Sequence, residues 1–229
     1  MASRSRGKCT FCGGTFAKSA MANHLKSCKA REPAPELSAA NRKRSPKQAR
    51  IFHIVVEGRD RPMYWMHVEV PEDATLGKLD EFLRDIWLEC CGHLSAFTID
   101  EARYTSDRER DFGEKSMRAK LGDVLDLGTK FYHEYDFGTT TELTLRVVAE
   151  RVGQTRGKEI GIMARNDPPA ITCDTCEKPA AKICAECVWE DEGWLCDVCA
   201  EEHECGEEML LPVVNSPRVG MCGYTGETY

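Results

Sequence analysis

One stretch near the C-terminus constrains the fold more than any other, because it is too rich in cysteine to be an ordinary packed segment. It reads CDTCEKPAAKICAECVWEDEGWLCDVCAEEHEC, and it contains three Cys-x-x-Cys pairs followed by a histidine and a cysteine. One such pair supplies two of the roughly four ligands of a tetrahedral zinc ion, so two pairs complete a site. The candidate ligands here are Cys173, Cys176, Cys184, Cys187, Cys196, Cys199, His203, Cys205 and Cys222.

The spacing of the pairs favours an interleaved arrangement. Nineteen residues separate Cys176 from Cys196, and fifteen separate Cys187 from His203. Gaps of roughly 15–20 residues are typical of zinc sites built from two knuckles. One site would combine Cys173, Cys176, Cys196 and Cys199, and the other Cys184, Cys187, His203 and either Cys205 or Cys222. Sequential pairing of the first two knuckles is the alternative, since a seven-residue loop can also close. The interleaved spacing resembles that of cross-braced B-box and RING-like zinc modules.

Disulfides would be the other use for so many cysteines. The chain opens with MASRSRGKCTF, which is basic and polar and does not read as a secretory signal. Thiols of intracellular proteins stay reduced, so metal binding is favoured over a disulfide framework. No apolar run approaches the roughly 18 residues that span a bilayer. We therefore expect a cytoplasmic protein that makes no membrane contact.

A second zinc motif stands at the other end of the chain, in residues 1–30. The stretch CTFCGGTFAKSAMANHLKSC offers Cys9, Cys12, His24 and Cys28 as ligands. His24 and Cys28 are four residues apart and so share one face of a predicted helix. The pattern resembles a ββα finger of the Cys-Cys-His-Cys variety. A segment this small cannot bury enough surface to fold without its metal.

The two cysteine-rich ends together predict about three zinc ions per chain, each with a structural role. Neither end shows three ligands beside an open position and a general base, which a catalytic zinc site requires. We therefore expect no enzymatic activity and no small-molecule substrate. Cys90, Cys91 and His93 form a weaker candidate for a further site. Cys90 also continues the apolar stripe of a predicted helix and is more simply a small core residue.

Charge is distributed unevenly along the 229 residues, whose net charge is −7. The first fifty residues carry twelve Lys and Arg against two acids, whereas residues 173–208 carry twelve Asp and Glu against two Lys. We interpret residues 31–50 as a basic disordered linker and expect the basic arm, residues 1–50, to bind DNA or RNA. A merely solvated tail is the alternative. The acidic module, residues 173–229, would repel phosphate and is better suited to a protein partner. The candidate nucleic-acid contacts are Arg42, Lys43, Arg44, Lys47 and Arg50.

Between these ends, residues 51–167 have the pattern of an α+β domain. The runs IFHIVVEG and MYWMHVEV alternate apolar and polar residues and predict a hairpin. The following run, TLGKLDEFLRDIWLECC, predicts a helix that ends at Gly92. Further strands are expected at Ala96–Ile99, Lys130–Phe137, Glu142–Val148 and Glu159–Ala164. This order favours a β-grasp-like, or ubiquitin-like, plan, in which one helix covers a mixed sheet.

A specific resemblance lies in KFYHEYDFGTTTELTLRVV, residues 130–148, with its YDFG motif at Tyr135–Gly138. With LGDVLDLG before it and the Cys91-Gly92-His93-Leu94 run upstream, it resembles the plasmid pRi-type ORF-three-like family over roughly residues 51–165. The resemblance implies a fold and a link to mobile elements, whose passenger proteins are among the members. The family commonly continues after YDFG with Asp, Trp and His, whereas this chain has Thr139-Thr140-Thr141-Glu142. No function that depends on that Trp or His carries over.

These observations predict a non-enzymatic zinc-binding adaptor with the domains 1–30, 31–50, 51–167 and 168–229. It would bind nucleic acid through its N-terminal arm and protein through its C-terminal module. An enzyme using a pocket lined by His93, His133 and Asp136 is one alternative. His133 and Glu134 should point to opposite faces of their strand, however, and Asp136 and Gly138 are expected to shape a turn. A purely protein-binding module is the other alternative.

Overall fold

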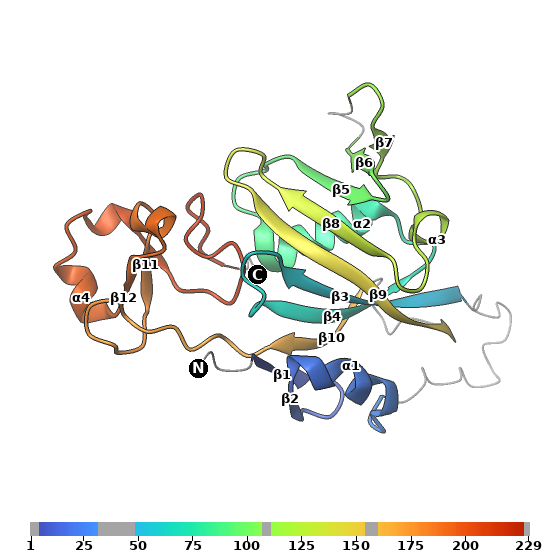
Figure 1. The fold of residues 1–229 in the computed structure, drawn as a ribbon, viewed down its shortest axis with the longest axis horizontal. Coiled ribbons are helices and arrows are strands. Elements are labelled where there is room, and N and C mark those ends of the chain that lie inside the picture. The colour runs from blue at the N-terminus through green and yellow to red at the C-terminus, as the bar shows by residue number, and fades with distance from the viewer. Residues whose placement is uncertain (1–4, 32–48, 107–110, 154–159, 227–229) are drawn as a thin grey trace, which may run out of the picture.

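The computed structural model describes residues 5–31, 49–106, 111–153 and 160–226. Figure 1 shows a large sheet at the centre, a small ββα unit beside one edge, and a C-terminal module to one side. The ββα unit comprises β1 (Arg6–Cys9), β2 (Thr15–Ala17) and α1 (Lys18–Ser27). The C-terminal module comprises β11 (Lys182–Cys184), a 3-10 turn (Cys187–Glu190), β12 (Trp194–Leu195), α4 (Asp197–Glu201), a second 3-10 turn (Glu207–Met209) and β13 (Leu210–Pro212).

The central domain supplies most of the large sheet. Its strands are β3 (Ala49–Gly58), β4 (Trp65–Pro71), β5 (Ser95–Ile99), β6 (Ala102–Thr105), β7 (Lys115–Ser116), β8 (Lys130–Tyr135), β9 (Thr141–Gly153) and β10 (Gly161–Asn166). The sheet order is β2-β1-β10-β4-β3-β9-β8-β5-β6-β7. The predicted hairpin is confirmed, since β3 and β4 pair antiparallel from Ile51 with Pro71 to Glu57 with Trp65. β6, β7 and the short helix α3 (Leu121–Val124) were not predicted from the sequence.

The pairing pattern establishes an α+β domain but does not confirm a β-grasp. Among the described strands of the large sheet, each neighbouring pair is antiparallel except β6 with β7. The mixed sheet that we expected is therefore a mostly antiparallel one. Antiparallel neighbours can be joined by short turns, which explains why one main helix is enough to connect these strands.

The main helix is shorter than its sequence pattern predicts. α2 runs from Leu76 to Leu83 and continues as a π-type turn over Arg84–Leu88. Thr75 caps its start, accepting a hydrogen bond on its hydroxyl from the Lys78 N–H. Glu89 is already extended, so the helix ends before Cys90 rather than at Gly92. Gly92 does have a positive φ of 79°, but it lies in the loop that follows. The early end places Cys90, Cys91 and His93 in a loop.

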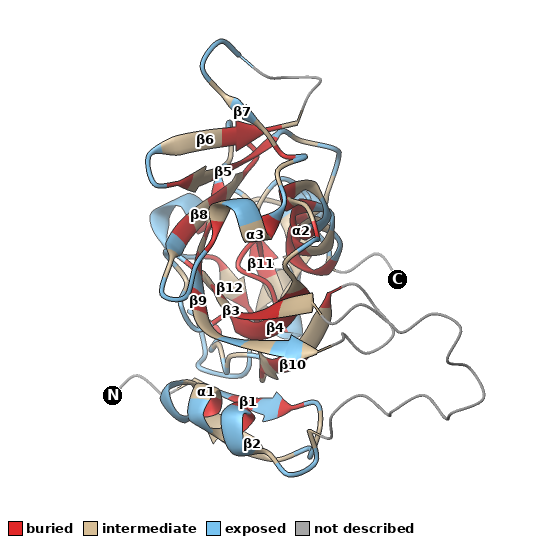
Figure 2. Cartoon of the chain, turned by 90° about the vertical axis from the view of Figure 1, so that its right-hand side faces the viewer, coloured by how far each residue is buried: buried red, intermediate tan, exposed pale blue. Residues whose placement is uncertain are grey.

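The two faces of the sheet are covered by different elements. One face packs its apolar residues, such as Phe52 and Ile54, against α2 in the main core. On the other face, Trp65, Met163 and Ala164 form a separate cluster with Met21 and Leu25 of α1. Figure 2 shows the ββα unit as a small layer beside β10, with exposed residues on its α1 and β1. Burying one such apolar side chain contributes roughly 1.5–3 kcal/mol, so α1 is held on the sheet by packing as well as by β1.

Candidate metal centres

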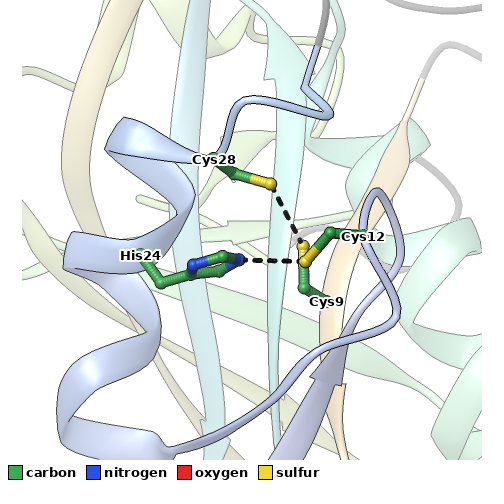
Figure 3. Close-up of side chains that lie close together, drawn as sticks. All are labelled: Cys9, Cys12, His24 and Cys28. Atoms are coloured by element: carbon green, nitrogen blue, oxygen red, sulfur yellow. Dashed lines mark hydrogen bonds between the residues drawn. The ribbon is translucent and has the colours of Figure 1, made fainter.

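The N-terminal cluster joins the turn between β1 and β2 to the helix α1. Cys9 ends β1, Cys12 lies in the turn, His24 is on α1 and Cys28 follows its last residue. The Cys12 Sγ and His24 Nε2 atoms are 3.4 Å apart, and the Cys9 and Cys28 Sγ atoms are 3.9 Å apart (Figure 3). Sulfur ligands at about 2.3 Å from a tetrahedral ion lie about 3.8 Å from one another. The four predicted ligands therefore surround a space of the right size for zinc.

The turn that carries Cys12 is shaped for a thiolate. Gly13 has a φ of 70°, a conformation that residues other than glycine rarely adopt. This conformation brings the Gly14 N–H to 3.4 Å from the Cys12 Sγ, where it donates a hydrogen bond and lowers the pKa of the Cys12 thiol. The ring of Phe16 stacks on His24 with centroids 3.7 Å apart, which fixes the imidazole. The finger is thus organised around its ligands.

In the C-terminal module, eight of the nine candidate ligands form two interleaved groups of four. The first is Cys173, Cys176, Cys196 and Cys199, and the second is Cys184, Cys187, His203 and Cys205. In the first group Cys176 Sγ lies 3.5 Å from Cys196 Sγ and 3.6 Å from Cys199 Sγ. In the second group Cys187 Sγ lies 3.6 Å from His203 Nε2 and 3.7 Å from Cys205 Sγ. The interleaved grouping, and not the sequential one, is the arrangement in the structure.

Backbone N–H groups aim at the sulfur atoms of both interleaved groups. Hydrogen bonding from the backbone of Cys196 is the largest cause that lowers the pKa of Cys173, to about 6. Burial tends to raise the pKa of Cys184, but the backbone N–H groups of Cys187 and Glu186 outweigh it and bring that pKa to about 7. A thiol must lose its proton to bind a metal, so these contacts favour the metal-binding form.

A fourth group contains the remaining cysteines, and sequence analysis found it only in part. Cys90, Cys91 and His93 lie in the loop after α2, and Cys222 reaches them from the last segment of the chain. His93 Nε2 is 2.9 Å from Cys91 Sγ and 3.2 Å from Cys222 Sγ. The open choice between Cys205 and Cys222 is thus resolved, with Cys205 beside His203 and Cys222 in this fourth group. The short spacing of Cys90, Cys91 and His93 was the only signal in the sequence.

The donor atoms of all four groups fit zinc. Each group offers four ligand atoms that lie within 4.8 Å of one another, either as four sulfurs or as three sulfurs and one imidazole nitrogen. Thiolate and imidazole ligands suit zinc, whereas magnesium and calcium take oxygen ligands. Four protein ligands leave no position for substrate, which is typical of structural sites. The four clusters are therefore compatible with metal ions that hold the fold.

The candidate nucleic-acid residues lie mostly beyond what the structure describes. Arg42, Lys43, Arg44 and Lys47 fall outside the described residues. Arg50 lies in β3 rather than in the linker, and its guanidinium makes three ion pairs, the nearest 3.1 Å from Glu72. It also stacks over the Phe52 ring at 4.8 Å. On the finger helix, Lys18 contacts Glu57 and donates to the Pro62 carbonyl at 2.9 Å, so this side chain faces the sheet.

The histidines of the central sheet serve its packing. His133 is fully buried and lies 2.7 Å from Asp80 Oδ1, whereas Glu134, on the opposite face, pairs with Arg103. His53 Nε2 lies 2.8 Å from His67 Nδ1 on neighbouring strands. Burial, with repulsion from His67, lowers the pKa of His53 to about 3, and burial lowers that of His67 to about 4. Both imidazoles are therefore neutral at neutral pH.

The YDFG motif forms a strand-end turn with a buried ion pair. Asp136 has a φ of 66°, and its Oδ1 accepts hydrogen bonds from the N–H groups of Gly138 and Thr139. Its Oδ2 accepts one from the Arg218 guanidinium at 2.7 Å. Burial tends to raise the pKa of Asp136, but the Arg218 contact and the turn N–H groups outweigh it and lower it. His93, which we considered with Asp136 as part of a pocket, lies 3.5 Å from that carboxylate, whereas His133 contacts Asp80 instead.

Comparison with known proteins supports the family resemblance. A family model described as plasmid pRiA4b ORF-3-like protein matches residues 48–170, more than half of the chain. A crystal structure of a protein of unknown function from Methanosarcina mazei Go1 is 19% identical, with a TM-score of 0.44, over 52% of this chain and 68% of that chain. No curated protein matches the chain. Within the described residues, no helix is both long and apolar enough to cross a membrane.

Proposed function

Because the chain belongs to the plasmid pRiA4b ORF-3-like protein family, which accounts for its centre, we propose that its function lies in the zinc modules added at either end. The protein is a non-enzymatic zinc-binding adaptor that carries nucleic acid on its basic arm and protein on its acidic module. A link to mobile elements is part of the same proposal. The observation that supports it most directly is that all thirteen cysteines fall into the four metal-binding groups.

The opposite charges of the two ends of the chain suit an adaptor with two kinds of partner. Residues 1–50 carry twelve Lys and Arg. A positive segment attracts nucleic acid mainly through phosphate contacts, so its affinity falls steeply with salt. The finger helix itself packs against the sheet through Met21 and Leu25. We therefore assign the nucleic-acid contacts to the basic residues of 31–50 rather than to base-reading positions on α1.

An electrophoretic shift assay at two salt concentrations tests the nucleic-acid half. The variant Arg42→Gln/Lys43→Gln/Arg44→Gln/Lys47→Gln removes four charges and leaves the finger intact. We expect it to bind DNA or RNA more weakly, with a salt dependence shallower by about 0.9 for each duplex phosphate that the variant no longer neutralises. The matched control Lys115→Gln/Arg118→Gln/Lys120→Gln/Lys130→Gln removes equal charge from the central domain. Unchanged binding by the first variant, or no binding by the wild type at low salt, overturns this half.

The protein-binding half is supported by apolar side chains exposed on an acidic module. The Trp189 side chain is 62% exposed and Val198 equally so. Trp189 also lines a cleft of about 230 Å³ between the module and the central domain, together with Arg59, Arg61 and Met221. Aromatic residues are enriched at interfaces, and the twelve acids of residues 173–208 favour a basic partner. The partner we propose is thus a basic segment with an apolar anchor.

Titration with model peptides tests the protein-binding half. We expect an arginine-rich peptide containing leucine to bind, with an affinity that decreases in salt and in the variant Trp189→Ala. The control Phe112→Ala removes an exposed aromatic ring from the central domain and should leave binding unchanged. Equal binding of a glutamate-rich peptide, or indifference to Trp189→Ala, would remove this half of the proposal and leave a structural zinc protein.

A further inference from the structure

We propose that Cys90, Cys91, His93 and Cys222 form a fourth zinc site, which fastens the end of the chain to the central domain and releases its metal more readily than the other three. The two parts of this site are far apart in sequence. His93 and Cys222 are separated by 129 positions, yet their ligand atoms are 3.2 Å apart. This metal would therefore connect two domains, whereas each of the other three lies within one module.

The distances between sulfur atoms in the fourth group match those in the other three. Cys90 Sγ lies 3.7 Å from Cys91 Sγ, which in turn lies 3.8 Å from Cys222 Sγ. Both distances are close to the roughly 3.8 Å between two sulfur ligands of a tetrahedral zinc ion. The ligand set, three cysteines and one histidine, is also that of the finger and of the second C-terminal group. No cysteine of the chain is left over for another role.

Neighbouring side chains support these ligands as an outer layer of hydrogen bonds. Arg218 donates to Cys90 Sγ at 3.3 Å while it also binds Asp136. A buried guanidinium next to a thiolate offsets its negative charge. The Tyr135 hydroxyl accepts hydrogen bonds from the N–H groups of Cys90 at 3.4 Å and His93 at 3.3 Å. Such contacts orient the ligands of metal sites. Two residues of the YDFG motif therefore position this site.

The site is one of several attachments of the C-terminal segment, whose Tyr224 is also buried. Earlier along that segment, Ser216 Oγ donates to the Trp87 carbonyl at 2.7 Å, and Arg61 donates to the Val219 carbonyl at 2.7 Å. Val219 is fully buried in the main core. Cys222 lies beyond these contacts and is exposed. Loss of the metal would then release Cys222 from the loop after α2, while Ser216 to Val219 and the buried Tyr224 stay in place.

Exposure distinguishes this group from the others. Each of the other three contains at least one buried cysteine, namely Cys9 in the finger, Cys173 and Cys196 in one C-terminal group, and Cys184 in the other. In the fourth group Cys91 and Cys222 are exposed, and neither Cys90 nor His93 is buried. A chelator in solution therefore reaches these ligands first. When zinc becomes scarce, this site would lose its metal before the others, and the link between the C-terminal segment and the loop after α2 would open.

Native mass spectrometry of the full chain tests the proposal. We expect four zinc ions in the wild type and in the control Thr225→Ser, which alters an exposed residue of the same segment, and three ions in Cys222→Ser. With a chelator added stepwise, one ion should leave first in the wild type, and this early release should be absent from Cys222→Ser. Cys9→Ser should retain the early release, because it removes a different ion.

Three results would overturn the proposal. The first is a count of three ions in both the wild type and Cys222→Ser. The second is a wild-type mass lower by two hydrogens, with a peptide linking Cys222 to Cys90 or Cys91, because a disulfide would then replace the metal. The third is early release that persists in Cys222→Ser. None of these results depends on nucleic-acid or protein binding, so the adaptor proposal stands or falls separately.

Discussion

The finger and the C-terminal module both bring cysteine and histidine side chains together, but they are attached to the central domain in different ways. The finger extends the large sheet, because β1 pairs with β10 from Gly7 with Asn166 to Cys9 with Ala164. Its apolar residues form a cluster of their own with Trp65. The C-terminal module has a separate three-stranded sheet, yet its Ile183 and Val188 belong to the main core. Backbone pairing and a small separate cluster thus hold the finger, whereas a share in the main core holds the C-terminal module.

Loss of one metal can therefore have local or global consequences, depending on how its module is attached. A zinc site that orders only its own module should affect the melting of that module alone. A site whose module also fills the main core should affect the whole domain when it is removed. Single-residue variants distinguish these two cases, and the largest effect is expected at a buried ligand.

Loss of a buried ligand should be more damaging in the C-terminal module than in the finger. Cys184→Ser removes a ligand next to Ile183, which is fully buried in the main core. Binding of a structural zinc ion contributes roughly 10–16 kcal/mol in isolated fingers, so either module should unfold without its metal. We expect the main melting temperature of Cys184→Ser to be well below that of Cys9→Ser, although each variant loses one ion. Equal melting temperatures by calorimetry would show that the contrast is wrong.

A methyl group added at Gly7 should separate the finger from the sheet without removing zinc. A Cβ there would lie 2.7 Å from Asn166 Cα and closer still to the Arg165 carbonyl oxygen, both on β10. Such overpacking costs typically 1–3 kcal/mol. We expect Gly7→Ala to keep its metal count while the backbone amides of β10 exchange faster with solvent. The control Gly77→Ala meets its nearest atom at an ordinary 3.5 Å. Protected β10 amides in Gly7→Ala would contradict edge pairing as the attachment.

The buried pair of His53 and His67 should make stability depend on pH. An unfolded histidine binds a proton near pH 6.5, whereas these two have folded pKa values of about 3 and 4. Below about pH 6.5 the unfolded state therefore binds more protons, and stability falls as pH decreases towards 4. In the variant His53→Leu/His67→Leu, the denaturant concentration at the midpoint of unfolding should fall less as the pH decreases. Both proteins share the same zinc clusters, so the difference between their curves isolates the pair; parallel curves would contradict it.

The finger also influences the pKa values of His53 and His67. Repulsion from Arg31 and Lys26 adds to the lowered pKa of His53, and repulsion from Lys18 adds to that of His67. All three basic residues come from the finger and the residues just after it. Separation of the finger in Gly7→Ala should therefore raise both pKa values, and NMR titration of the imidazoles measures this directly.

The spacing of cysteine and histidine pointed to the candidate ligands of three clusters and favoured the grouping that the structure has, but it left both the sequential pairing and the choice between Cys205 and Cys222 open. Knuckles and helix positions are local, so the spacing of Cys9, Cys12, His24 and Cys28 nearly fixes their geometry. Likewise, loop length limits which of the C-terminal pairs can meet. The alternation of apolar and polar residues in IFHIVVEG predicted the first strand of the hairpin for the same reason, because the two-residue period of a strand depends only on neighbouring residues.

How these parts are joined is visible only in the folded chain. Cys222 meets His93 across 129 positions, and no spacing rule extends over such a distance. The pairing of β1 with β10 uses backbone N–H and C=O groups, which all residues except proline share and which leave no mark in the sequence. The early end of α2 places Cys90 in a loop although its stripe continues a helical period. Local spacing therefore predicts which side chains of a segment can share a metal, whereas long-range packing decides which segments lie together.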